Sequence, residues 1–340
     1  MALQKEWRNH CSLLGERLLA PMKKTLLAPM FVILSFSITY AQKTDSLPKK
    51  LDSLKTKSVT DSAQGKKINV ATAAYNERTK VNGRVYFTLF GTDFTQEVSG
   101  PFHTPRRSWH KVIGFVAIEG GLFFLDKPVQ RYATDFMARN SGLRGVSHYI
   151  TNFGFAYEVY TLAAFGAGGW IFNRPKMRTT TLLATQSYLV AGAVQELTKF
   201  LTGRQRPNYL PKDATGPSPT FHGPGYSLKH GSTSFPSGHA TAIFAAATVY
   251  AQEYRNLKWV PYVSYSAATL VGLSRITENK HWITDVFAGA ALGYVTGLQV
   301  TRNYHRYAYL QNHKTKAGSV SFGLQYNYDH VEPGVAYRFR

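Results

Sequence analysis

Long apolar stretches occupy most of the chain beyond Trp109. Each is about 15 to 20 residues long, rich in Ala, Gly and Leu, and carries only isolated charges such as Glu119, Glu158 and Glu196. Stretches of this length form helices, but hydropathy alone does not separate a buried core helix from a membrane span. The sequence therefore predicts an all-α fold, a bundle of about six helices. The predicted helices are 111–126, 157–172, 180–201, 240–256, 259–273 and 283–301.

Alternation of apolar and polar residues, which is typical of β-strands, occurs only outside these helices. Val85, Phe87 and Leu89 alternate with other residues in "GRVYFTLFGTDF" (83–94), which predicts one short strand. "SVSFGLQYNY" (319–328) and the final "GVAYRFR" also alternate, which predicts a terminal hairpin. Two strands cannot close a barrel, so we expect short β appendages at both ends of the helical bundle.

The N-terminal region has the features of an export signal. The segment "MKKTLLAPMFVILSFSITYAQ" begins at Met22 with two lysines, continues as a mostly apolar run and ends in small residues. This pattern predicts cleavage after Ala41, with an uncut membrane anchor as the alternative. Met22 is also the better candidate for the true start, because the residues before it include acidic and polar ones that signals lack.

These patterns divide the chain into four predicted parts. They are a leader and signal peptide (1–41), a polar linker with a short strand (42–104), a helical domain (105–305) and a hairpin-like tail (306–340). The sole cysteine, Cys11, lies in the leader. A mature chain would therefore have neither a disulfide nor a thiolate metal site.

The overall charge narrows the class of partner. Forty Lys and Arg residues against 19 Asp and Glu give a formal net charge of +21. Such a charge favours nucleic acid, a membrane surface or a phosphorylated substrate, and does not choose among them. With 44% apolar residues and 14% aromatics, the chain is not globally disordered.

Two segments place cations and a histidine at predicted helix ends. In "ELTKFLTGRQRPNYL" (196–210), Lys199 and Arg206 are seven apart, about two helical turns, so both can point the same way, and Arg204 is a further cation. Taken alone, these cations would simply complement the helix dipole. In "PSGHA", His239 lies at a helix N-terminus, where exposed N–H groups suit an anion. A lone histidine there is more often a cap or a surface residue.

A third segment pairs a histidine with a carboxylate. In "LSRITENKHWITDVFAG" (273–289), His281 and Asp285 are four residues apart. On a helix this spacing lets the carboxylate reach the imidazole, fix its tautomer and raise its nucleophilicity. Ion pairs with this spacing are also common structural features, so the pair by itself does not establish a site.

Together, the three segments resemble the signature of the type 2 phosphatidic acid phosphatase superfamily, to which the vanadium haloperoxidases also belong. That signature is Lys, six residues, Arg-Pro; then Pro-Ser-Gly-His; then Ser-Arg, five residues, His, three residues, Asp. Every position is filled in order and in spacing, and the resemblance covers about residues 105–305. The matching residues are Lys199, Arg206, Pro207, Pro236, Ser237, Gly238, His239, Ser274, Arg275, His281 and Asp285.

The resemblance implies a phosphate pocket within the helical bundle and a role for each matching residue. It implies that His281 attacks phosphorus to form a phosphohistidine, with Asp285 orienting the imidazole. It implies that His239 protonates the leaving group and then activates water. Neither a metal nor a cofactor is implied, because three cations neutralise the phosphoryl oxygens. The implied phosphate-binding residues are Lys199, Arg206, Arg275, Ser237 and Gly238.

One part of the signature region departs from the family. Members often have a glycine and apolar residues before the nucleophilic histidine, whereas this chain has Glu278, Asn279 and Lys280. Asn tolerates the left-handed backbone conformation, so we expect the turn to be preserved with a more polar pocket rim.

These observations predict a phosphatase of the bacterial cell envelope, with its site on the periplasmic side. The predicted substrate is a phosphorylated membrane lipid of the phosphatidic acid or isoprenyl pyrophosphate type, and nucleic acid is not an expected partner. Membrane association is predicted because four tryptophans lie near predicted helix ends, where interfacial aromatics are expected. They are Trp109, Trp170, Trp259 and Trp282. The alternatives are a soluble periplasmic acid phosphatase acting on small phosphate esters, a vanadium-dependent haloperoxidase, and a non-enzymatic envelope protein.

Overall fold

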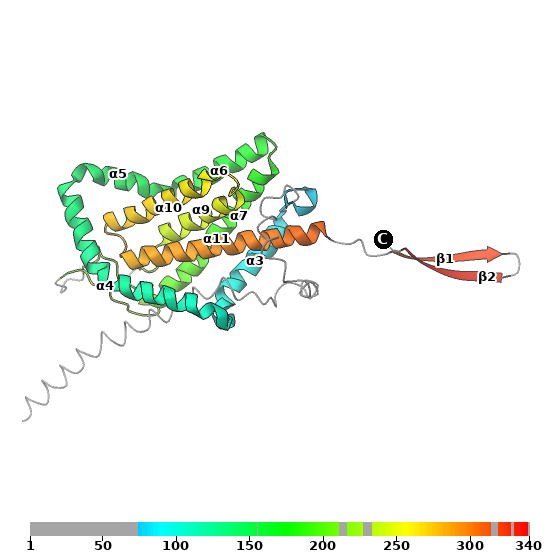
Figure 1. Cartoon of the computed structure of the whole chain (residues 1–340), viewed down its shortest axis with the longest axis horizontal. Helices are drawn as coiled ribbons and strands as arrows, with labels where there is room; N and C mark the ends of the chain where they lie inside the picture. The colour runs from blue at the N-terminus through cyan, green and yellow to red at the C-terminus, as the bar shows by residue number, and fades with distance from the viewer. Residues whose placement is uncertain are drawn as a thin grey trace, which may run out of the picture.

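A computed structural model describes residues 74–154, 156–210, 216–226, 233–313, 319–327 and 330–338. The predicted leader and the first part of the predicted linker lie outside these residues. Within them, eight α-helices form a bundle (Figure 1). They are α3 (Gly83–Ser99), α4 (Trp109–Arg139), α5 (Ser141–Thr151), α6 (Ala156–Ile171), α7 (Pro175–Thr202), α9 (Gly238–Glu253), α10 (Trp259–Thr277) and α11 (Ile283–Asn312). Short 3-10 helices lie at Glu77–Thr79, Gly100–His103, Arg106–Ser108 and Asn152–Gly154. The all-α prediction is confirmed for this part of the chain.

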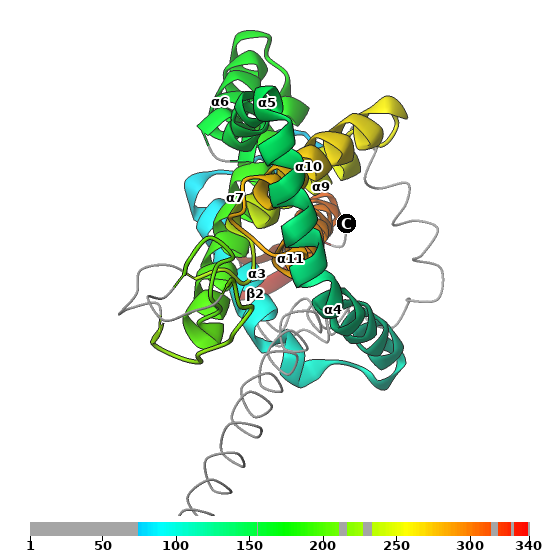
Figure 2. The same ribbon diagram turned by 90° about the vertical axis from the view of Figure 1, so that its left-hand side faces the viewer.

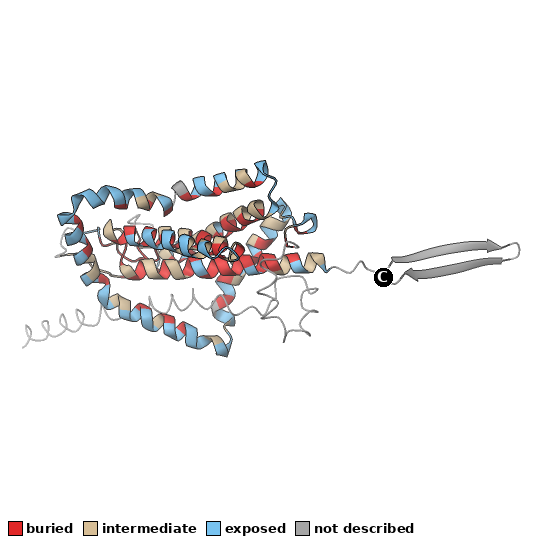
Figure 3. Ribbon diagram, turned by 45° about the horizontal axis from the view of Figure 1, so that its top comes forward, coloured by how far each residue is buried: buried red, intermediate tan, exposed pale blue. Residues whose placement is uncertain are grey.

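Helix α9 is the centre of the bundle and packs against α7, α10 and α11. Buried residues are concentrated on α7, α9 and α11, whereas α4, α5 and α6 are exposed along much of their length (Figure 3). Gly289, Gly293 and Gly297 of α11 recur every four residues and face the α9 backbone. A Cβ atom on Gly293 would lie 2.2 Å from the Thr241 carbonyl oxygen, so only glycine permits this approach. The sequence spacing thus brings the N-terminal ends of α9 and α11 together.

The segment predicted as a strand at 83–94 is instead part of α3, so that prediction is wrong. The Asn82 side chain caps the helix by accepting a 2.9 Å hydrogen bond from the Val85 amide. Val85 and Leu89 are four residues apart and fit one helical face, while Phe87, between them, is 72% exposed. Over so short a run, the spacing of these apolar residues is compatible with either a helix or a strand. The segment is a helix because α3 packs against α7 and α11.

Helix α4 extends well past the predicted end at residue 126 and includes Pro128. Proline removes one hydrogen bond and bends a helix without necessarily ending it. Figure 1 shows the bend, and Figure 2 shows α4 passing across the end of the bundle where α11 begins. The short helix α5 that follows was not predicted. Its buried residues, Ser147 and Thr151, are four apart and lie on one face.

Two strands follow α11. Strand β1 (Ser319–Asn327) pairs antiparallel with β2 (His330–Arg338), with Ser319 opposite Arg338 and Asn327 opposite His330.

Candidate active site

The predicted site residues come from four helices whose ends meet. Lys199 lies in the last turn of α7 and Arg275 in the last turn of α10, while His239 lies in the first turn of α9 and Asp285 in the first turn of α11. Arg206 and His281 lie in the adjoining loops. The charges of Arg275, His281, Lys199 and Arg206 all act on the His239 imidazole, which places these groups around one point.

His281 and Asp285 form the pair that their spacing predicts. The Nδ1 atom of His281 is 3.6 Å from Asp285 Oδ2 and 3.4 Å from the Ser234 hydroxyl oxygen. Asp285 Oδ2 also accepts a hydrogen bond from the Ser234 hydroxyl and a 2.8 Å bond from the Trp282 amide. Because Nδ1 faces acceptors, it carries the ring proton, and the lone pair of Nε2 points to the opposite side of the ring.

Burial lowers the pKa of the His281 imidazole to about 4. The Asp285 carboxylate opposes this effect, while Arg206 and Arg275 lower the pKa further. The ring is only 3% exposed, so the charged form lacks water to solvate it. His281 is therefore neutral near pH 7, which is the form that a nucleophile requires.

Burial also lowers the pKa of His239, to about 3, and the nearby cations lower it further. A phosphate bound among these cations would reverse their electrostatic effect and favour the protonated ring. Gly154, the last residue of the 3-10 helix before α6, lies directly against this histidine. A Cβ atom on Gly154 would be 3.0 Å from the His239 ring and 2.7 Å from Val271. Nothing in the sequence pattern links Gly154 to this site.

Two hydrogen-bond donors at the site have no partner within the protein. The Ser237 hydroxyl is fully buried and unpaired, and so is the Nε atom of Arg275. A buried polar atom without a partner is costly, so such donors mark the place of a ligand. Arg206 uses its own Nε for a 3.2 Å bond to the Thr233 carbonyl, which fixes the side chain beside them.

The unusual turn before His281 has the expected conformation. Asn279 has φ of 56°, in the left-handed region that Asn tolerates. Its side chain accepts a 3.0 Å hydrogen bond from Gln130 of α4. Glu278 pairs with Arg275 at 2.8 Å, so the rim is polar, also as expected.

The structure corrects the expectation for Trp282. This residue is 1% exposed and donates from its indole to the Gln205 carbonyl at 2.8 Å, so it is not an interfacial aromatic. Trp109, Trp170 and Trp259 are exposed by 41%, 75% and 62%. The difference arises because position 282 precedes a helix that begins inside the bundle.

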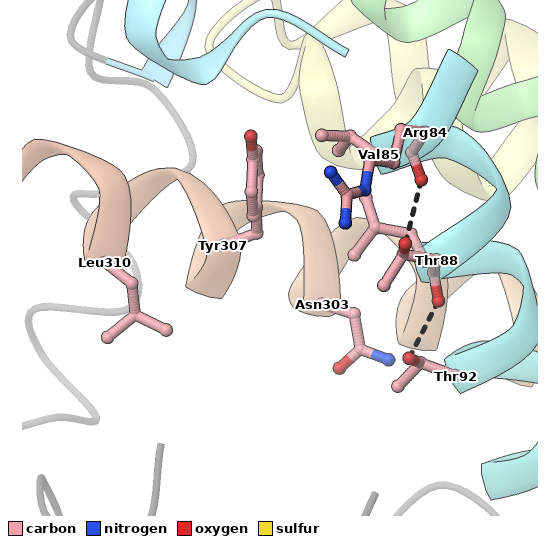
Figure 4. A pocket seen from close by; sticks show the side chains of 8 residues that line it. Arg84, Val85, Thr88, Thr92, Asn303, Tyr307 and Leu310 are labelled. Carbon is pink, nitrogen blue, oxygen red and sulfur yellow. Dashed lines mark hydrogen bonds between the residues drawn. The ribbon is translucent and has the colours of Figure 1, made fainter. Parts of the chain in front are cut away.

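A cavity of about 190 Å³ lies elsewhere, between α3 and the last turns of α11 (Figure 4). It contains none of the predicted site residues. Its lining residues are Arg84, Val85, Thr88, Leu89, Thr92, Asn303, Tyr307 and Leu310. Among the described residues, no group of three or more His, Cys, Asp or Glu side chains is arranged to hold a metal ion.

Comparison with known proteins points to one family. The sequence profile of the PAP2 superfamily matches residues 180–309, a range that includes all three motifs. The chain is 43% identical over 65 residues to a lipid A 1-phosphatase of Porphyromonas gingivalis, covering 19% of this chain and 15% of that protein. It is 31% identical over 138 residues to lipid phosphate phosphatase 1 of Arabidopsis thaliana, covering 34% and 42%. The chain therefore spans less than half of each of these relatives.

A solved structure, the transmembrane PAP2 type phosphatidylglycerolphosphate phosphatase from Bacillus subtilis, is similar with a TM-score of 0.40 and 21% identity. The similarity covers 55% of this chain and 90% of that one. Residues 180–309 of the chain thus match the PAP2 superfamily, and the relatives to which this region is similar are phosphatases.

Proposed function

We propose that this protein hydrolyses the phosphate monoester or pyrophosphate of a membrane lipid through a phosphohistidine, without a metal ion. The observation that carries this proposal is the convergence of three cations and an unpaired, buried Ser237 hydroxyl on the two histidines. The N-terminal ends of α9 and α11 lie at the same place, so their amide groups also favour an anion.

In the first half of the proposed reaction, Nε2 of His281 attacks phosphorus. The bond from phosphorus to the leaving oxygen breaks as His239 gives that oxygen a proton. Lys199, Arg206 and Arg275 balance the charge on the equatorial oxygens, assisted by the Ser237 hydroxyl and the Gly238 amide. Asp285 accepts a hydrogen bond from the Nδ1–H group of His281 and stabilises the positive charge of the phosphohistidine ring.

In the second half, neutral His239 removes a proton from water, and the resulting hydroxide attacks phosphorus from the side that the leaving group vacated. The phosphorus–nitrogen bond breaks, inorganic phosphate forms and His281 returns to its neutral state. The same histidine thus serves as acid and then as base, and no proton is left over at the end of the cycle.

A lipid substrate is supported by the outer surface of the bundle. Large apolar side chains are exposed on α4, α6 and α10, as on Phe124 (81%), Ile171 (77%) and Tyr262 (77%). Extended apolar surface of this kind favours contact with a membrane. In the described part of the chain, α11 has the length and hydropathy of a membrane span, although 67% of its apolar stretch is buried in the bundle. The relatives named above include phosphatases of lipid A and of lipid phosphates. We propose an envelope location with the site on the periplasmic side.

The decisive experiment measures phosphate release by the purified protein in detergent. The substrates are phosphatidic acid, an isoprenyl pyrophosphate and a soluble aryl phosphate, with His281→Ala as the matched control. We expect release from the lipids to exceed release from the aryl phosphate. Preference for small monoesters, together with recovery of the protein without detergent, would support a soluble acid phosphatase instead. Halide oxidation with peroxide and added vanadate would support a haloperoxidase.

A further inference from the structure

Arg204 lies beside the candidate active site but is built differently from the three cations of the signature. Its side chain is completely buried. Four aromatic rings surround the guanidinium, with ring centres 4.8 to 5.8 Å from its central carbon. They belong to Phe123, Phe221, Phe235 and Trp282. Arg204 is thus enclosed by side chains of the protein on all of these sides.

The guanidinium joins two carboxylates that are far apart in the sequence. One nitrogen donates to Asp285 Oδ1 at 2.5 Å and to the Thr284 hydroxyl at 2.6 Å, and the other donates to Asp126 of α4. Asp126 in turn accepts a 3.2 Å bond from the Thr284 amide at the start of α11. Both carboxylates are fully buried.

The backbone of Arg204 is also fixed. Its neighbour Gly203 ends α7 with φ of 54°, and a Cβ atom there would be 2.4 Å from the Gly223 carbonyl oxygen. The Ser234 amide donates a 2.8 Å hydrogen bond to the Arg204 carbonyl. The backbone thus links Ser234, whose hydroxyl donates to Asp285 Oδ2, to Arg204, whose side chain donates to Asp285 Oδ1. Each oxygen of Asp285 therefore has its own donor from this loop region.

We propose that Arg204 and Asp126 are positioning residues, which hold the Asp285 carboxylate and thereby aim and polarise His281. The proposal rests on the function proposed above for His281. Without Arg204, Asp285 Oδ1 would lose its donor, and the carboxylate could turn away from the imidazole. The positive charge of Arg204 is balanced by Asp126, so the charges of Arg204, Asp126 and Asp285 sum to −1. This net negative charge would stabilise the imidazolium of the phosphohistidine.

The test compares three variants with the wild type. Asp126→Asn keeps the side-chain shape but removes one negative charge. The double variant Arg204→Met/Asp126→Asn removes opposite charges together, which buried pairs tolerate better than the loss of one partner. Glu253→Gln is the control, since Glu253 forms a buried 2.7 Å pair with His305 at the other end of α9. The measurements are kcat and KM with 4-nitrophenyl phosphate, and an NMR titration of the His281 ring assigned with His281→Asn.

We expect kcat to fall about 10- to 100-fold in Asp126→Asn and at least as far in the double variant, with KM within about twofold of the wild type. Glu253→Gln should retain the wild-type kcat. The His281 pKa should fall in Asp126→Asn, because the cluster that holds Asp285 loses a negative charge, and should not change in Glu253→Gln. The other charged groups around this ring, which the variants leave in place, are Asp285, Arg206, Arg275 and His239.

Folded Asp126→Asn and double variants with wild-type kcat and wild-type His281 titration would overturn the proposal. A loss of kcat in Glu253→Gln equal to that in Asp126→Asn would overturn it as well, because the effect would then be a general one of buried charge. If the wild type releases no phosphate, the proposed function fails on its own. The NMR titration then decides whether Arg204 and Asp126 control the His281 ring.

Discussion

The two ends of the parallel helices α9 and α11 both bury a histidine beside a carboxylate, but only one end has the features of a reactive site. At the C-terminal end, His305 Nε2 lies 2.7 Å from Glu253 Oε1, and the Tyr75 hydroxyl donates to the second oxygen of Glu253. Both carboxylate oxygens are thus occupied by protein groups, as are those of Asp285. The difference is that the pair of His281 and Asp285 at the N-terminal end faces the three cations Lys199, Arg206 and Arg275.

This difference shows what separates a structural histidine–carboxylate pair from a candidate catalytic one. Burial and pairing are common to both ends, so neither identifies chemistry. Helix direction contributes, because two N-termini offer amide groups to an anion at one end, whereas at the other end α9 presents its C-terminal carbonyl groups and α11 continues to Asn312. An anionic substrate is therefore favoured only at the end that contains the signature residues.

The largest expected effect separates the two histidines. His281→Ala should lower kcat at least about a thousandfold, because the covalent step is lost, while the protein remains folded. The matched variant His305→Ala should reduce thermal stability and leave kcat of the remaining folded protein unchanged. Phosphate release and circular dichroism melting measure the two quantities. Comparable turnover in His281→Ala and the wild type would contradict the nucleophile assignment.

His239→Ala should have an effect that depends on the leaving group. With an alkyl or lipid phosphate, loss of the general acid should lower kcat about 10²- to 10⁴-fold. With an aryl phosphate, whose leaving oxygen needs no proton, the loss in the first step should be much smaller. Steady-state rates on both substrates provide the check. An equal reduction on the two would be evidence against a proton donor at this position.

The acid side of the pH profile should reflect the lowered pKa of His281. The ring must be neutral to attack, and its pKa is about 4 instead of the ordinary 6.5. With an aryl phosphate, kcat/KM should therefore persist through pH 6 and fall about tenfold per unit only below pH 4, after correction for ionisation of the substrate. An acid limb at the ordinary histidine pKa would show that the site is more hydrated than the structure indicates.

Close packing of α9 on α11 should be sensitive to single methyl groups. Gly293→Ala should destabilise the protein by about 1 to 3 kcal/mol, because the new Cβ meets the α9 backbone. Gly120→Ala on α4 has nothing within 4 Å of its Cβ and should be neutral or stabilising by up to about 1 kcal/mol. Unfolding midpoints of the two variants test this, and equal midpoints would disprove the contact.

The smallest expected effect is that of a chelator. EDTA should leave turnover unchanged because the proposed reaction uses cationic side chains in place of a metal, whereas orthovanadate should inhibit at low concentration by resembling the five-coordinate phosphorus. Both are measured on the same phosphate-release assay. Loss of activity in EDTA that returns on addition of a divalent metal would require a different mechanism.

Short-range patterns predicted the helices well wherever they were long. The apolar stretches at 240–256 and 283–301 correspond to α9 and α11, because a run of this length has few alternatives. The prediction of a strand at 83–94 was wrong because the spacing of Val85 and Leu89 fits both the period of two of a strand and the four-residue spacing of a helix. Only the buried surface of α3 against its neighbours distinguishes the two, and that surface is formed by residues distant in the sequence.

The sequence alone indicated the resemblance to the superfamily and the set of candidate reactive residues, since the three motifs keep their order and spacing within single local segments. The tertiary structure decided which residues support them. Arg204 was one cation among several in the sequence, and Asp126 marked only a predicted helix end. Arg204 is 78 positions from Asp126 and 81 positions from Asp285 along the chain. Such contacts depend on how helices pack and bend, and no local pattern specifies them.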